Sequence, residues 1–125
     1  MAIVIYLALG LHVLSATFWA GSTFTLARNA GKGAAELFGA QMGAAAVTVV
    51  AGAYLWAQMF GTSGGHTVLG LGALAAVIAA IVQALVVGRV RTAIDQEERA
   101  RARAALGHRI AAGLLAITVL CMVFQ

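Results

Sequence analysis

The sequence predicts an all-α membrane protein, a polytopic four-helix bundle with its N-terminus and C-terminus outside. Three observations predict this fold class. Of the 125 residues, 62% are hydrophobic and only 10% are charged, whereas a soluble domain carries roughly 25% charged residues. The apolar residues form four blocks, and one membrane crossing needs about 20 such residues. The chain has no proline, so nothing in it is suited to break a helix. This length leaves no room for a soluble catalytic domain.

Polar stretches separate the four blocks and set the expected helix boundaries. We expect one transmembrane domain over residues 1–125, with helices at about 2–27, 34–60, 66–94 and 103–124. The first block lacks a basic n-region and is too long for a signal peptide, so we expect a retained helix. The blocks are apolar all round, whereas the strands of a membrane barrel alternate apolar and polar residues over about ten positions. Helices are therefore the expected elements.

The segment from Arg89 to Arg103 is predicted to continue the third helix into the cytoplasm. Asp95 with Arg99, and Glu97 with Arg101, are i,i+4 pairs with the acid first, which is the better order on a helix. Such pairs indicate a solvated helical face and carry no chemistry of their own.

The basic residues predict the orientation of the bundle. They lie in or beside the first and third connections: Arg28, Lys32, Arg89, Arg91, Arg99, Arg101, Arg103 and Arg109. Because cytoplasmic loops carry the excess of lysine and arginine, both connections are expected on the cytoplasmic side of the inner membrane. The arginines serve topology and contact with lipid headgroups. Nucleic-acid binding is not expected, since no soluble module presents them.

Small residues are expected to hold the helices together, because lipid provides no hydrophobic drive between helices. Gly39 and Gly43 form a GxxxG step on the second helix, and Gly52 on that helix and Gly70 and Gly72 on the third are further small residues expected to pack. Gln41, Gln58 and Gln83 are predicted to donate hydrogen bonds between helices. A bundle this rich in small residues can leave a packing face free, which favours a homo-oligomer or a larger membrane complex.

His12 is the sharpest candidate for a functional residue. It lies about ten residues inside the first helix, roughly 15 Å below its outer end, and an ionisable side chain at that depth marks a functional site by default. Ser15 and Trp19 share its helical face with small residues, so a flat cofactor or a neighbouring helix can lie there. The alternative is a neutral imidazole hydrogen-bonded to Thr48, Thr118 or a backbone carbonyl.

His108 is the second candidate cofactor ligand. It lies four or five residues inside the cytoplasmic end of the fourth helix, on the order of 10 Å from His12 in depth. Two ligands of one haem must lie at nearly the same depth, so a second ligand from another protomer, or an open axial position, fits better. For His108 itself an interfacial structural role is favoured.

A separate candidate metal site lies at the outer face of the membrane. The topology gathers its residues there: Met1, Met59, His66, Cys121 and Met122. Thioether, thiolate and imidazole groups select copper(I), although methionine and cysteine are also ordinary apolar fillers. The chain shows no serine-histidine-acid grouping, Walker loop, paired carboxylates or zinc spacing. Any enzymatic chemistry would therefore come from a cofactor.

A run in the first helix resembles a known group of membrane proteins. The run Leu11-His-Val-Leu-Ser-Ala-Thr-Phe-Trp-Ala-Gly21 is similar to the first helix of copper-resistance protein D and of HemJ-type protoporphyrinogen oxidases. Residues 49–55 and the arginine-rich entry to the fourth helix are similar too. The resemblance implies that His12 is the buried histidine of the group, with Trp19 and Gly21 beside it. It implies copper passage, or haem b binding with electron transfer or porphyrinogen oxidation.

Three functions follow from these observations. The first is a redox protein that binds haem b through His12, and the second is a copper transport or tolerance protein. The third is an accessory subunit without a cofactor, packed against larger membrane proteins. The sequence departs from the oxidase pattern, in which the glycine stands one position later and is followed by a proline-arginine step; here Arg28 has no proline before it.

Overall fold

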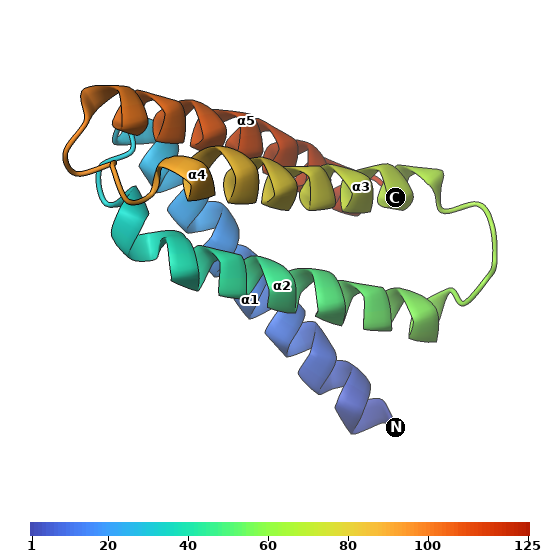
Figure 1. The fold of residues 1–125 in the computed structure, drawn as a ribbon. Coiled ribbons are helices and arrows are strands. Elements are labelled where there is room, and N and C mark those ends of the chain that lie inside the picture. Colours follow the sequence, from blue (N-terminus) through green and yellow to red (C-terminus); the bar gives the residue numbers. More distant parts are fainter.

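The computed structural model describes all residues, 1–125, and is built from four long helices (Figure 1). Helix α1 spans Ala2–Arg28, α2 spans Ala34–Met59 and α5 spans Glu98–Val123. The third long helix consists of α3 (Thr67–Val82), a π-helical turn η1 (Gln83–Val87) and the short α4 (Gly88–Val90). All four are long and apolar enough to cross a membrane. The predicted fold class, an all-α membrane four-helix bundle, is confirmed.

The helices pack as two pairs that meet at one end. Helix α1 packs mainly on α2, and α3 packs mainly on α5, while α1 also contacts α5. Figure 1 shows the N-terminal half of α1 diverging from α3 and α5, while it stays next to α2. The connection between α1 and α2 and the connection before α5 lie together at the opposite end of the bundle. That end carries the basic residues, and we refer to it as the basic end.

The interior of the bundle is made mostly of alanine. One buried cluster consists of Trp19, Ala45, Ala76, Ala79, Ala111 and Leu115. A second one, nearer the basic end, consists of Leu26, Ala34, Val87, Ile94 and Ala104. Small side chains let helix backbones approach closely, which supplies the packing that replaces a hydrophobic drive in lipid. The large apolar side chains, Leu14 at 72% exposed among them, face outward.

The third helix ends earlier than predicted, and the fourth begins earlier. The expected boundaries of 66–94 and 103–124 are replaced by an end at Val90 and a start at Glu98, with turns between them. Asp95 therefore lies outside any helix, and the continuous cytoplasmic helix was a wrong prediction. Ile94 is fully buried in the second cluster, so the chain folds back over the bundle there. Glu98 lies in the first turn of α5, where a negative charge complements the helix dipole.

The glycines that allow close packing are not the predicted GxxxG pair. A Cβ atom added at Gly39 or Gly43 would meet nothing within 4 Å, so both face away from the other helices. At Gly72, by contrast, an added Cβ would lie 2.7 Å from the Cβ of Cys121. Helices α3 and α5 thus touch at Gly72, which confirms it as one of the small residues expected to pack.

Candidate functional site

His12 is held against α2 by a single hydrogen bond. Its Nδ1 lies 2.8 Å from the backbone oxygen of Thr48. A carbonyl oxygen only accepts hydrogen bonds, so Nδ1 carries the proton and donates it. The neutral imidazole then has its lone pair on Nε2. The ring is half-buried, and its Nε2 has no hydrogen bond within the protein. His12 therefore presents an available nitrogen ligand.

Gly52 makes the room that this ring occupies. A Cβ atom at position 52 would lie 2.9 Å from Cε1 of His12 and 3.2 Å from its Nδ1. Real Cβ contacts essentially never come that close, so any other residue at position 52 would displace the imidazole. Beside it, the hydroxyl oxygens of Ser15 and Thr48 are 2.8 Å apart. Together these contacts fix how α1 lies on α2 around His12.

A second polar layer, nearer the basic end, is centred on Gln83. The indole Nε1 of Trp19 donates to Gln83 Oε1 at 2.5 Å. Because an indole nitrogen can only donate, this bond fixes the orientation of the Gln83 amide. The amide nitrogen then faces Thr23 Oγ1 at 2.9 Å and His108 Nδ1 at 3.1 Å. All four side chains are buried.

The Gln83 amide in turn fixes the tautomer of His108. Since the amide nitrogen carries two hydrogens and no lone pair for hydrogen bonding, His108 Nδ1 must accept. The proton of the neutral imidazole then lies on Nε2. That nitrogen is enclosed by protein and has no partner. His108 therefore carries its proton on the nitrogen opposite to the one protonated in His12.

The π-helical turn brings Gln83 to the inside of the bundle. Ala79, Gln83 and Val87 are all fully buried, which keeps one face inward in steps of four residues. In a regular α-helix, residues spaced by four rotate gradually away from one face. The wider π turn compensates for this rotation and keeps Val87 on the same face as Ala79 and Gln83. Opposite this turn, a Cβ at Gly107 would lie 3.0 Å from Val86 Cγ1. The glycine next to His108 thus lets η1 approach α5.

Two of the three glutamines form the predicted bonds between helices. Gln41 Nε2 reaches Ser22 Oγ at 3.1 Å and Thr23 Oγ1 at 3.4 Å on α1, and Gln83 joins three helices as described. Gln58 is exposed instead. Gln41 Oε1 is enclosed without a partner.

The two histidines differ in their suitability as metal or haem ligands. A histidine that ligates a metal almost always donates its other ring N–H to a carboxylate, a carbonyl or water. His12 donates its Nδ1–H to the backbone carbonyl of Thr48, whereas His108 Nδ1 accepts a hydrogen bond from the Gln83 amide. The two histidines also lie at different depths. Gln83 bonds to both His108 and Trp19, so His108 is near the level of Trp19. Trp19 is seven residues beyond His12 on α1. Seven residues span about 10 Å of helix.

The sequence suggested that Trp19 borders a surface for a cofactor beside His12, but the structure places its ring elsewhere. Its side chain is 1% exposed and belongs to the alanine-rich cluster. Its role in the structure is to donate a hydrogen bond to Gln83. A cofactor bound at His12 would therefore not stack on this indole ring.

The residues of the predicted copper site are spread over the end of the bundle opposite the basic end, which we call the outer end. The His66 ring packs against Phe60 and Trp56, with ring centroids 4.0 Å and 6.0 Å apart. Cys121 packs against Gly72 of α3. Gly72 lies six residues after His66, so Cys121 is well over one helical turn from His66 along α3. The remaining candidates are methionines: Met1 at 82% and Met59 at 64% exposed, and Met122, half-buried. The structure contains no group of three or more histidine, cysteine, aspartate or glutamate side chains that could hold a metal ion.

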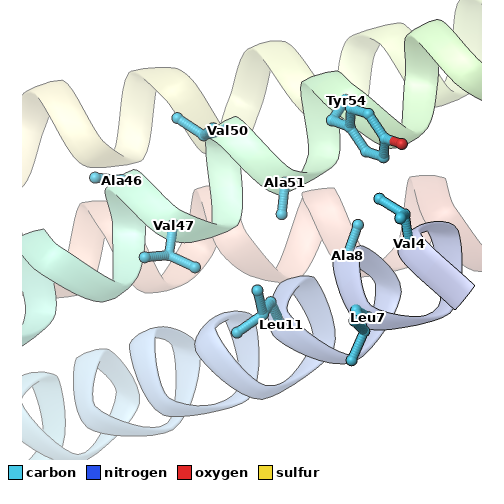
Figure 2. A pocket seen from close by; sticks show the side chains of 9 residues that line it. All are labelled: Val4, Leu7, Ala8, Leu11, Ala46, Val47, Val50, Ala51 and Tyr54. Atoms are coloured by element: carbon cyan, nitrogen blue, oxygen red, sulfur yellow. The ribbon is translucent and has the colours of Figure 1, made fainter.

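An apolar groove runs along the seam of α1 and α2 (Figure 2). It has a volume of about 570 Å³ and is lined only by hydrophobic residues: Val4, Leu7, Ala8, Leu11, Ala46, Val47, Val50, Ala51 and Tyr54. His12 is not part of its lining. The groove therefore offers apolar contact and no ligand.

Comparison with known proteins adds no relative. No family model, curated protein or solved structure matches this chain. The resemblance to the copper-resistance protein D and HemJ-like group stays a prediction from the first-helix residues.

Proposed function

We propose that this multi-pass membrane protein resides in the cytoplasmic membrane and binds haem b through Nε2 of His12. The four apolar helices are those of an integral membrane protein. The bound haem would serve electron transfer or porphyrin-related redox chemistry. Haem supplies a centre that accepts and releases one electron, and no residue of the chain offers such chemistry by itself.

One observation supports this assignment above all others. His12 is an intramembrane histidine whose Nδ1 donates to a backbone carbonyl, at 2.8 Å, and whose Nε2 lone pair is consequently available. A ligand histidine needs this orientation. The glycine at position 52, where a Cβ would lie 2.9 Å from the ring, preserves the space that this orientation requires.

The residues around the ring have separate parts in binding. His12 provides the ligand nitrogen, the Thr48 carbonyl holds the tautomer, and Gly52 keeps the imidazole flat against α2. No second imidazole of the same chain lies at this depth, since His108 is about two helical turns deeper and carries its proton on Nε2. We therefore expect an open axial position or a ligand from another protomer.

The test is an absorption spectrum of the protein purified from membranes of haem-replete cells, oxidised and reduced. We expect a Soret band in the wild type and its loss in His12→Ala. His66→Ala is the matched control, because His66 lies at the outer end against Phe60 and Trp56, and it should keep the band. A wild-type protein without a Soret band, or a band that survives in His12→Ala, would contradict the proposal.

An absent Soret band would leave the other functions to be separated. Copper retained after mild purification, and lost in His66→Ala or Cys121→Ser, would indicate the copper transport or tolerance protein. Co-purification with a larger membrane complex, without metal, would indicate the accessory subunit.

A further inference from the structure

Two connections that are far apart in the sequence meet at the basic end of the bundle. Gly31, between α1 and α2, has a backbone φ of +80°, and a Cβ added there would lie 2.8 Å from the carbonyl oxygen of Arg101 and 3.3 Å from the nitrogen of Ala105. Only glycine allows both this φ and this approach. The first connection therefore rests directly on the early turns of α5 (Figure 1).

Three basic residues lie at or within three positions of this backbone contact in the sequence. Arg28 is the last residue of α1, Lys32 follows Gly31, and Arg101 provides the backbone oxygen that Gly31 contacts. Arg28 and Lys32 are exposed, and Arg101 is half-buried. These observations are independent of the haem proposal.

Residues close in sequence to these three cations belong to a buried apolar cluster. Leu26 is 1% exposed, and Ala34 and Ala104 are fully buried in one cluster. They come from α1, α2 and α5, so the three helices pack together near these basic residues.

The charge of this end favours an anionic partner. The chain has eight basic and four acidic residues, a net charge of +4, and all of them except Arg109, which lies about three turns inside α5, are in or next to the first and third connections. The four acidic residues there, Glu36, Asp95, Glu97 and Glu98, are outnumbered by seven basic ones, so the charge of this end is positive. Basic clusters beside membrane helices bind the headgroups of anionic lipids.

We infer that Arg28, Lys32 and Arg101 form a binding site for a phospholipid headgroup with two phosphates. A headgroup with two separated phosphates offers one anionic group to the cations of the first connection and one to Arg101. The lipid would thereby link α1, α2 and α5 at this end. The occupant is a membrane lipid, held by its headgroup at the basic end.

The experiment measures lipid affinity of the purified protein in detergent, by native mass spectrometry and by thermal stabilisation. The probes are tetraoleoyl cardiolipin, dioleoylphosphatidylglycerol and dioleoylphosphatidylcholine. We expect the wild type to prefer cardiolipin over both others. Each basic residue near an anionic headgroup contributes about fivefold in affinity, so Arg28→Gln with Lys32→Gln and Arg101→Gln should weaken cardiolipin binding roughly a hundredfold.

The matched control removes the same charge elsewhere at the basic end. Arg99 and Arg103 lie two positions from Arg101, about 200° around the helix, and Arg89 lies on α4. We expect Arg89→Gln with Arg99→Gln and Arg103→Gln to change the affinity by less than about threefold. Two further variants separate charge from geometry. Lys32→Gln alone, in an exposed loop, should lower the affinity about fivefold. Gly31→Ala should weaken binding without removing any charge, because it disturbs the contact with α5.

Three results would overturn the inference. Equal losses in the two triple variants would show a diffuse electrostatic effect. Equal affinities for cardiolipin and phosphatidylglycerol would show that the second phosphate is not recognised. Displacement of cardiolipin by inorganic phosphate alone would show a site for free phosphate.

Discussion

The two halves of the bundle, the inner half at the basic end and the outer half at the opposite end, each contain one histidine within a membrane-spanning helix. The two histidines differ in the nitrogen that carries the proton. His12 donates from Nδ1 to the carbonyl of Thr48 and keeps a free lone pair on Nε2. His108 accepts at Nδ1 from the amide of Gln83, and its proton lies on Nε2. Burial does not decide between the roles, because His108 is the more buried of the two. The chemical type of the hydrogen-bond partner decides.

The two partners also differ in how firmly they are fixed. The carbonyl of Thr48 belongs to a helix backbone and cannot reverse its polarity. The amide of Gln83 could turn over, but the indole N–H of Trp19 holds its oxygen. The inner histidine is thus locked by a chain of side chains, and the outer one by backbone and by the room at Gly52.

The largest expected effect is on the inner half. Gln83→Leu removes the acceptor for Trp19 Nε1 and the donor to His108 Nδ1, leaving both groups buried without partners. Since each such group costs about 1–3 kcal/mol, we expect the free energy of unfolding to fall by about 3 kcal/mol, measured by denaturation in mixed micelles. Gln58→Leu is the control, because Gln58 is exposed. Equal stability of the two variants would contradict the role of the inner network.

A smaller effect is expected at the outer half. Gly52→Ala places a Cβ 2.9 Å from the His12 ring, so the imidazole must turn away and lose its bond to Thr48. We expect a loss of about 1 kcal/mol in unfolding free energy, together with a weaker Soret band. Gly43→Ala is the matched control on the same helix, because an added Cβ there meets nothing within 4 Å. If the two alanine variants bind haem equally well, Gly52 does not shape the site.

The smallest effect separates the hydroxyl of Thr48 from its carbonyl. Thr48→Val removes the contact with Ser15, 2.8 Å in length, and leaves the backbone oxygen that orients His12. Hydrogen bonds between membrane helices contribute about 0.6 kcal/mol on average, so unfolding should change by that amount and haem binding should not change. Loss of the Soret band in Thr48→Val would mean that the hydroxyl, and not the carbonyl, orients His12.

The helices were predictable from composition, because four apolar blocks in a chain without proline have few other folds. The interhelical roles of Gln41 and Gln83 were predictable too, since a buried amide in an apolar helix needs a partner. The end of the third helix at Val90 was not. Exposed charge pairs contribute only about 0.2–0.5 kcal/mol each, less than the burial of Ile94 that turns the chain back.

The arrangement of the candidate site needed the structure. A stripe such as Gly39 and Gly43 says that a helix can be approached closely, and it does not say from which side. Likewise the tautomers depend on the rotation of each helix about its axis, which decides whether His12 meets a carbonyl and His108 an amide. The π turn that brings Gln83 inward has no signal in the spacing of apolar residues, and the fixed amide could only be recognised once Trp19 was placed beside it.

The most direct test of these opposite tautomers is a nitrogen-15 NMR spectrum of cofactor-free protein labelled at histidine, in lipid nanodiscs. His12→Ala and His66→Ala assign the signals. The structure predicts that His12 is protonated at Nδ1 and His108 at Nε2. Two intramembrane histidines with the same tautomer, or a His12 protonated at Nε2, would contradict the assignment of His12 as the ligand.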